Sequence, residues 1–239
     1  MKRNLTHRLF PLMIIGAFIM LTNSCQKDHD NNSLVTDIDG NVYHTVQIGS
    51  QVWMVENLKT TTYRNGDSIP NITDSIEWSD LSTGAQCNYS NNSNLGTIYG
   101  KLYNWYAVSD PRNIAPKGWH VATDAEWTTL ENYVAEHMGT SGSVGKALAA
   151  TSDWTRFTVE GGVGSDLTKN NSTGFTALPG GNRYANGKHD DVGDIGCWWS
   201  STEADPASAW SRGIYCYYAT VSRNYGLKKC GFSVRCIKD

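Results

Sequence analysis

Hydrophobic and polar residues alternate between residues 36 and 58, where Val42, Val46 and Ile48 are separated by polar or aromatic positions. A period of two puts successive side chains on opposite faces of an extended chain and is typical of a β-strand. Gly49 and the serine after it supply a turn signal. The pattern therefore predicts a β-hairpin or a short meander.

The period changes to three and four residues after Thr123. Thr123 and Glu126 have the spacing of a capping box, in which the hydroxyl accepts from one backbone N–H and the carboxylate accepts from another. The apolar residues that follow are Trp127, Leu130, Val134 and Met138. They share one face of a helix that ends at Gly139, so we expect this face to pack on a core. A second, shorter helix is predicted over residues 143–150.

Short strand candidates, separated by Gly, Asn and Asp turns, occupy the last 65 residues. They are residues 175–178, 198–200, 209–218, 219–223 and 232–237. Residues 60–100 and 161–174 are rich in Gly, Asn, Ser and Thr and are predicted to be loops. Two helices, a small antiparallel β-sheet and long loops make an α+β domain.

The first 24 residues have the pattern of a signal peptide. Three basic residues precede an apolar run from Leu9 to Leu21, which is too short to span a bilayer comfortably. The run ends at Cys25, and residues 21–25 resemble a bacterial lipobox with Thr22 where Leu is usual. We expect lipidation at Cys25, where more than one acyl chain would anchor the protein stably to a membrane. The alternative is a secreted protein in which Cys25 is incidental.

Residues 25–36 are polar and partly acidic and are interpreted as a tether. Their acidic start also resembles the export signal that sends Bacteroidetes lipoproteins to the outer face of the outer membrane. The expected organisation is a lipoprotein signal peptide over residues 1–24, a polar tether over residues 25–36 and one domain over residues 37–239. The expected location is the outer membrane, with the chain lipid-anchored at the cell surface.

Charge excludes one class of partner. Without the three basic residues of positions 1–24, 17 basic and 23 acidic residues remain, a net charge of about −6. Nucleic-acid binding needs a basic surface, so no nucleic-acid partner is expected. Roughly 200 residues are enough for one domain with a substantial core. Nine Trp and twelve Tyr favour a core and a surface that both rely on aromatic side chains.

Five cysteines follow Cys25, and in an oxidising compartment such residues usually pair. Cys216 and Cys230 flank a predicted hairpin with its turn at residues 222–224, which would bring their side chains to disulfide distance. We predict this pair, Cys87 with Cys236 as a second pair, and Cys197 as a free thiol. No C-x-x-C spacing is present, so neither a metal nor another cofactor is expected.

Five spaced motifs follow one another in a fixed order. They are GWHVATDAEWTTL (118–130), TGFTALPGGNR (173–183), CWWSSTE (197–203), AWSR (209–212) and GFSVRC (231–236). With residues 51–70 and 99–108, they resemble the Fibrobacter succinogenes major paralogous domain, abbreviated FISUMP, over about residues 37–239. The resemblance implies a cell-surface domain of the C-type-lectin-like superfamily, related in pattern to formylglycine-generating enzymes. It implies no particular ligand.

Aromatic stacking on a sugar is the binding chemistry that the sequence favours, because an indole or phenol ring packs on the C–H face of a sugar while polar groups bind its hydroxyls. The loop predicted over residues 182–194 supplies such groups beside an aromatic residue. The candidate ligand-binding residues are Arg183, Tyr184, His189, Asp190, Asp191 and Trp198. The competing interpretation is structural, with Arg183, Arg212 and Arg235 holding buried carbonyls or carboxylates, and the tryptophans of the motifs, among them Trp210, in the core.

No catalytic motif is present, neither a G-x-S-x-G elbow nor a Walker loop nor an H-E-x-x-H helix. The sequence therefore favours a non-enzymatic binding or adhesion domain on a surface-exposed lipoprotein, with a glycan or a protein as ligand. The alternative is an enzyme or assembly factor related to formylglycine-generating enzymes. Those enzymes use a cysteine pair late in the chain, as Cys230 and Cys236 are here.

Overall fold

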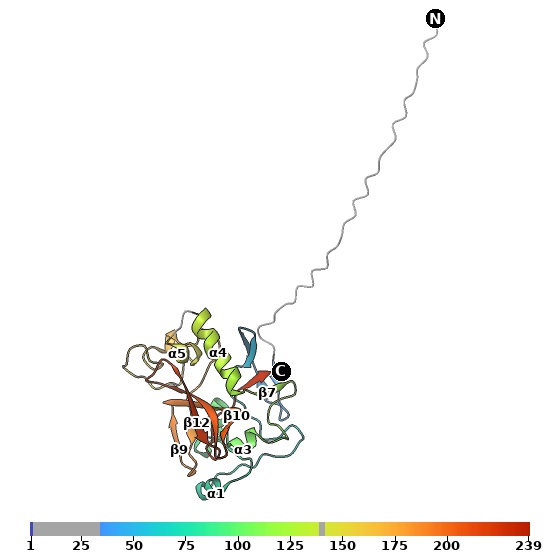
Figure 1. The fold of residues 1–239 in the computed structure, drawn as a ribbon, viewed down its shortest axis with the longest axis vertical. Helices are drawn as coiled ribbons and strands as arrows, with labels where there is room; N and C mark the ends of the chain where they lie inside the picture. The colour runs from blue at the N-terminus through green and yellow to red at the C-terminus, as the bar shows by residue number, and fades with distance from the viewer. Residues whose placement is uncertain (2–33, 139–141) are drawn as a thin grey trace. The chain divides into compact units, whose positions relative to one another are not determined.

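The computed structural model describes Met1, residues 34–138 and residues 142–239 (Figure 1). The chain divides into Met1–Asp30 and a compact unit, Asn31–Asp239, and the account below concerns the compact unit. The predicted signal peptide, the lipidation site Cys25 and the tether up to residue 33 lie outside the described residues. None of the described helices is long and apolar enough to cross a membrane.

The domain is mostly β-structure, with 31% of residues in strands and 21% in helices. The expected α+β fold of C-type-lectin-like type, with two helices and one small sheet, is therefore wrong. The strands are β1 Val35–Thr36, β2 Val42–Tyr43, β3 Thr45–Ile48, β4 Gln51–Met54, β5 Gln86–Cys87, β6 Leu102–Tyr103, β7 Trp119–Val121, β8 Gly180–Arg183, β9 His189–Val192, β10 Ile195–Asp205, β11 Ser208–Tyr215, β12 Val221–Leu227 and β13 Cys236–Lys238.

A curled five-stranded sheet forms one half of the β-structure, in the order β12-β11-β10-β8-β9. All its pairs are antiparallel except β10 with β8. A four-stranded sheet, β3-β4-β13-β7, forms the other half. In it, Ile237 of β13 pairs with Trp53 on one side and with His120 on the other, so the last strand joins segments far apart in the sequence. The predicted hairpin of residues 36–58 is confirmed as β3 and β4, with β1 and β2 pairing separately.

Five α-helices occur in the described residues, three more than expected. They are α1 Ser75–Asp80, α2 Ser93–Tyr99, α3 Trp105–Val108, α4 Asp124–His137 and α5 Val144–Leu148, and short 3-10 turns lie at Tyr89–Asn91 and Leu167–Lys169. The capping box of α4 is confirmed: the Thr123 hydroxyl accepts from the Glu126 N–H at 3.2 Å, and Glu126 accepts from the Thr123 N–H at 2.8 Å. Helices α1 and α2, strand β5 and the 3-10 turn Tyr89–Asn91 lie within residues 60–100 and interrupt the loop predicted there.

Tryptophan dominates the core. The Trp127 ring of α4 packs 5.0 Å from Trp53 and 6.3 Å from Trp198, which joins the helix to both sheets. A second cluster surrounds Trp105 and Trp199. Burial of such large rings contributes a major share of the stability of a fold with little aliphatic content. The expectation that motif tryptophans form the core is confirmed for Trp105, Trp127 and Trp199.

Two corrections concern the five-stranded sheet. Residues 182–194, predicted as a loop, are mostly the paired strands β8 and β9. The predicted hairpin turn at residues 222–224 is also wrong: Ile214 pairs with Val221, so the turn lies between them and residues 222–224 belong to β12. Residues 175–178 make only one bridge, between Ala177 and Ala149, instead of a strand.

The corrected register also separates the cysteines, and all five in the described residues are free thiols. Cys216 lies at the turn of the β11–β12 hairpin and Cys230 lies beyond its open end. Disulfides need Cα atoms within about 7 Å, so these positions do not pair. Cys87 and Cys236 lie in different hydrophobic clusters. Neither predicted disulfide is therefore formed in the structure, and Cys197 is also free.

Candidate functional site

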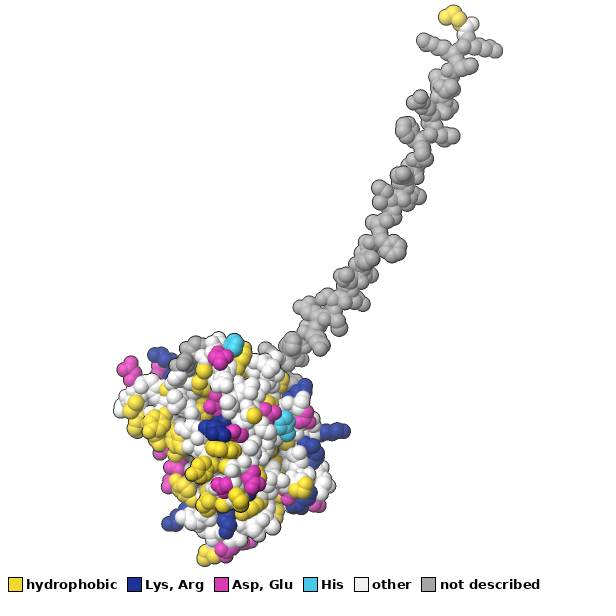
Figure 2. Space-filling model, in the orientation of Figure 1, with side chains coloured by type: hydrophobic (Ala, Val, Ile, Leu, Met, Phe, Trp, Pro, Cys, Tyr) yellow, Lys and Arg dark blue, Asp and Glu magenta, His cyan; other side chains and the backbone are white. Residues whose placement is uncertain are grey.

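A groove with a volume of about 810 Å³ opens over the five-stranded sheet. Its aromatic lining residues are Tyr184, Trp210, Tyr215, Tyr225 and Phe232. Its polar lining residues are Asn182, Asp191, Ser211, Arg212, Arg223 and Asn224, and the remainder are Ile195, Cys197, Gly213 and Cys230. On the side of the domain that carries β9 and β12, apolar and tyrosine side chains gather at the surface among charged ones (Figure 2). The groove therefore combines exposed rings with a few polar groups, as small-ligand sites commonly do.

One end of the groove, which we call the acceptor end, is formed by Asn182, Tyr184 and Asp191. Asp191 accepts a hydrogen bond from the Asn182 side-chain amide at 2.6 Å and another from the Tyr184 hydroxyl at 3.0 Å. Asn182 is only 4% exposed, yet its side-chain carbonyl oxygen has no hydrogen-bond partner. An unpaired buried acceptor costs about 1–3 kcal/mol, and this oxygen is one of five buried side-chain atoms without a hydrogen-bond partner in the described residues.

The backbone explains why Asp191 reaches the groove. The register of β8 and β9 places Asp191 opposite Gly181, and both have positive φ, at +69° and +64°. A Cβ on Gly181 would lie 2.6 Å from the Asp190 carbonyl oxygen, so only glycine fits there. Asp is among the few residue types that adopt this conformation readily. The positive φ values of Gly181 and Asp191 interrupt the regular strand geometry at the candidate site. Unusual backbone conformations often cluster at functional sites.

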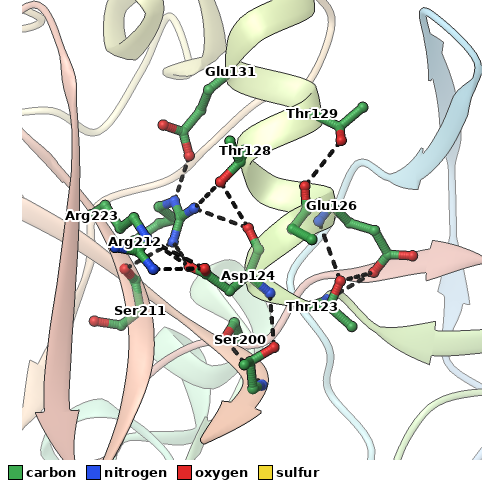
Figure 3. Close-up of polar contacts among 12 residues, drawn as sticks. Thr123, Asp124, Glu126, Thr128, Thr129, Glu131, Ser200, Ser211, Arg212 and Arg223 are labelled. Atoms are coloured by element: carbon green, nitrogen blue, oxygen red, sulfur yellow. Dashed lines mark hydrogen bonds and ion pairs between the residues drawn. The ribbon is translucent and has the colours of Figure 1, made fainter. Parts of the chain in front are cut away.

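Two more lining residues, Arg212 and Arg223, belong to an ion network with Asp124 and Glu131, which we call the arginine clamp (Figure 3). Arg212 is 1% exposed and donates to Glu131 through Nε and to Asp124 through Nη1 at 2.7 Å. Its Nη2 donates to the Asp124 carbonyl and to the Thr128 hydroxyl. Arg223 donates to the same Asp124 carboxylate at 2.9 Å. The clamp thus ties the first turns of α4 to β11 and β12.

Next to the clamp, the Arg223 guanidinium stacks on an aromatic ring. The Arg223 guanidinium lies 3.5 Å from the centre of the Trp210 ring. Trp210 pairs across the strands with Tyr225, whose ring is 6.1 Å away at right angles. Tyr225 is 66% exposed. The Tyr225 ring is therefore open to solvent, while the Arg223 guanidinium next to Trp210 is paired with Asp124.

The pKa shifts of the clamp oppose one another. Burial acts to raise the pKa of Asp124, but hydrogen bonds from Arg223 and Arg212 outweigh it and lower the pKa. At Glu131 burial is the stronger effect and raises the pKa despite the contact with Arg212. At the acceptor end, burial and the hydrogen bond to Asp191 raise the pKa of Tyr184 to about 12, so this phenol is neutral near pH 7.

The structure brings two of the six candidate ligand-binding residues, Tyr184 and Asp191, into the groove. Arg183 is fully buried, where it donates to the carbonyls of residues 72, 73, 74 and 187 and lies 4.2 Å from the Trp78 ring. Trp198 is 1% exposed, and its Nε1 donates to Asn57. Both are core residues, which agrees with the structural interpretation for Arg183.

The other two candidates lie outside the groove lining. His189 lies in β9 with its Nε2 3.6 Å from the Cys87 sulfur, and burial lowers its pKa to about 4. Asp190 is exposed and accepts from the N–H of Asp191. The sequence therefore identifies the right segment, but only two of its named side chains lie in the groove.

Sequence reasoning missed the second wall of the groove, formed by β11 and β12. Trp210 was assigned to the core, although it is only partly buried and lines the groove. Tyr225 and Asn224 were not considered, because the misplaced turn hid their position beside β11. A correct register would have paired Trp210 with Tyr225 and Arg212 with Arg223. Cross-strand pairing of two aromatic residues and of two arginines was the sequence signal that could have identified this wall.

The cysteines of the groove are poor nucleophiles. Burial raises the pKa of Cys197 to about 12 and also raises that of Cys230, so few thiolates form near pH 7. Cys236 is fully buried in β13, and burial raises its pKa to about 12 as well. Across residues 34–138 and 142–239, no three His, Cys, Asp or Glu side chains are arranged to hold a metal ion.

Comparison with known proteins gives one result. A sequence model of the Fibrobacter succinogenes major domain matches residues 46–238, which include both sheets from β4 onward and the whole groove. Searches among curated proteins and among solved structures found no match.

Proposed function

Because the chain belongs to the Fibrobacter succinogenes major domain family, we propose that it is a surface-exposed lipoprotein whose domain binds a glycan without catalysing a reaction. The groove over the five-stranded sheet is the proposed binding site. Nucleic acid is not a proposed partner, because the expected mature chain carries excess negative charge.

The observation that carries the proposal is the Asp191 carboxylate, which lies beside the exposed Tyr184 ring in a groove with further aromatic lining. A sugar hydroxyl is both donor and acceptor, so it can donate to the Asp191 carboxylate. Tyr184, 43% exposed, supplies a ring on which the C–H face of the same sugar can pack. Stacking on an aromatic ring together with hydrogen bonds from a few fixed polar groups is a general way to bind a small polar ligand.

A glycan array tests the binding proposal. The full chain in detergent, probed with and without calcium, should bind a subset of glycans in both conditions, because no calcium-dependent step is proposed. Asn182→Ala and Tyr184→Ala should each weaken binding about tenfold, the factor for ~1.4 kcal/mol. Absence of any glycan signal in both conditions would overturn the proposal and favour a protein ligand.

The proposed surface location depends on Cys25, which follows the signal-like run and precedes a polar tether. Acylation there would retain the chain at the outer membrane, since two or more acyl chains anchor stably. Wild-type protein should enter the detergent phase of a Triton X-114 partition, and the Cys25→Ala variant should enter the aqueous phase. A variant that stays in the detergent phase contradicts this part of the proposal.

The alternative of an enzyme or assembly factor related to formylglycine-generating enzymes has less support. It would require reactive thiols at Cys230 and Cys236, and burial raises the pKa of both. Rapid alkylation of either cysteine by iodoacetamide at pH 7 in the folded chain would revive this alternative.

A further inference from the structure

The aromatic lining of the groove continues beyond it. Tyr215, the last residue of β11, lines the groove, and its ring lies 5.6 Å from Tyr217 and 6.0 Å from Tyr218. The rings of Tyr217 and Tyr218 are 4.6 Å apart at an angle of 70°. Phe157, from the segment before β8, lies 5.7 Å from Tyr217. We call Phe157, Tyr215, Tyr217 and Tyr218 the tyrosine ridge.

Two of the four ridge residues are exposed, whereas Tyr217 is partly buried and packs against the core cluster that contains Trp127. Tyr218 is 55% exposed and Phe157 is 40% exposed. Within the described residues, no hydrogen bond holds the hydroxyl of Tyr217 or Tyr218. Contiguous exposed apolar surface is rare on a soluble domain and marks interaction sites. Figure 2 shows apolar side chains at the surface on this side of the domain.

Charge limits what the combined surface can accept. Its two lining arginines, Arg212 and Arg223, both pair with Asp124, so neither is an unpaired cation. Asp190 and Asp191 lie at the acceptor end, where they would repel an acidic saccharide. The ridge itself carries no charge. A neutral ligand with many hydroxyls and several apolar faces fits both parts.

We propose that the ligand is a neutral polysaccharide chain, with one unit bound at the acceptor end and further units stacked along the tyrosine ridge. This inference rests on the proposed glycan binding and adds to it the charge and the length of the ligand. The polar groups are confined to the groove, so the first unit is recognised by hydrogen bonds. The ridge offers only rings, so later units add affinity with little discrimination between sugars.

The test is calorimetric titration of the full chain in detergent with neutral oligosaccharides of two lengths. The probes are maltose, cellobiose, xylobiose and mannobiose, together with the hexasaccharide of each series. In at least one series the hexasaccharide should bind at least tenfold more tightly than the disaccharide. Tyr218→Ala should lower hexasaccharide affinity threefold to tenfold and leave disaccharide affinity unchanged.

Two further variants make the result specific. Phe157→Ala, at the far end of the ridge, should also weaken hexasaccharide binding, which guards against a folding defect of Tyr218→Ala. Ile38→Ala removes an apolar side chain of similar exposure, 52%, from the β1–β2 turn and should change neither affinity. Equal affinity for both lengths would overturn the inference and leave glycan binding standing. No binding of any of the eight saccharides would overturn the inference, and glycan binding would fall with it only if the glycan array also gave no signal.

Discussion

The acceptor end of the groove and the arginine clamp use similar polar residues and differ in how fully their hydrogen bonds are made. At the arginine clamp, the Arg212 guanidinium donates to two carboxylates, a hydroxyl and backbone carbonyls. At the acceptor end, the Asn182 carbonyl oxygen is buried without a partner. The same contrast separates two buried asparagines, because the Asn57 oxygen accepts from Trp198 and from Arg235.

This difference indicates which polar groups serve the fold and which serve a ligand. A buried group with every hydrogen bond made stabilises the packing around it, and its loss leaves other groups unpaired. A buried group with a missing partner costs stability in the free protein and can recover that cost when a ligand supplies the partner. Substitutions in the arginine clamp should therefore lower stability. Substitutions at the acceptor end should instead weaken ligand binding.

The largest expected effect is at the clamp. Arg212→Met removes the partner of two largely buried carboxylates, Asp124 and Glu131, and should lower the free energy of unfolding by about 3–5 kcal/mol. Urea unfolding followed by tryptophan fluorescence measures this. Arg223→Met is the matched control, because Arg223 is nearly half exposed, its ion pair is screened by solvent, and its loss should lower stability far less. Equal losses for the two variants would show that the clamp does not depend on the buried arginine.

A similar contrast separates two aromatic residues that the sequence grouped together. Trp198→Ala empties a core site beside Trp127 and should cost about 3–5 kcal/mol of unfolding free energy. Tyr184→Ala removes a side chain that is 43% exposed and should cost less than ~1 kcal/mol. Thermal melting by circular dichroism compares them. A Tyr184 variant that melts as early as the Trp198 variant would place Tyr184 in the core.

Acid should weaken the clamp. The pKa of Asp124 is lowered in the folded chain, so its contribution is present above its unfolded pKa and is lost as pH falls through the folded pKa. Glu131 has a raised pKa, so its contribution is largest at low pH and falls as pH rises through its folded pKa. Asp124→Asn should therefore make the loss of stability on acidification, below about pH 4, shallower than in wild type. An unchanged slope in urea unfolding at several pH values would contradict the assignment.

The smallest stability effect is expected at the acceptor end. Asp191→Asn keeps the shape and tolerates the positive φ, while it removes the charge that accepts from Asn182 and Tyr184. The free energy of unfolding should change by less than ~1 kcal/mol. Affinity for the best neutral hexasaccharide should fall at least tenfold in calorimetry. A variant that binds normally but unfolds readily would make Asp191 a structural residue.

The sequence predicted what local patterns determine. The capping box of Thr123 and Glu126 involves residues three apart, and the 3.6-residue period of α4 follows it, so both are confirmed. The motifs identified the family correctly. The segment 182–198 stays a prediction as a ligand site, and its Asn182, Tyr184 and Asp191 line the groove.

The rest depends on contacts that no local pattern contains. Arg212 meets Glu131 and Asp124 across 81 and 88 positions of sequence. Strand β9 is at the edge of its sheet, where charged residues are favoured, so its His-Asp-Asp sequence was mistaken for a loop. The turn between β11 and β12 was misplaced by several residues, which moved Cys216 toward Cys230 and hid Tyr225. For these reasons the predicted fold class and disulfides were wrong, and the groove residues of β12 were not predicted.

The most direct test of the account observes the Asn182 side-chain amide itself. In ¹H–¹⁵N spectra of the full chain in detergent, titration with the tightest-binding neutral hexasaccharide should shift the Asn182 side-chain signals saturably. The side-chain signals of Asn57, which is equally buried and fully paired, should stay in place. Binding that leaves the Asn182 signals unmoved would contradict the claim that the acceptor end is the ligand site.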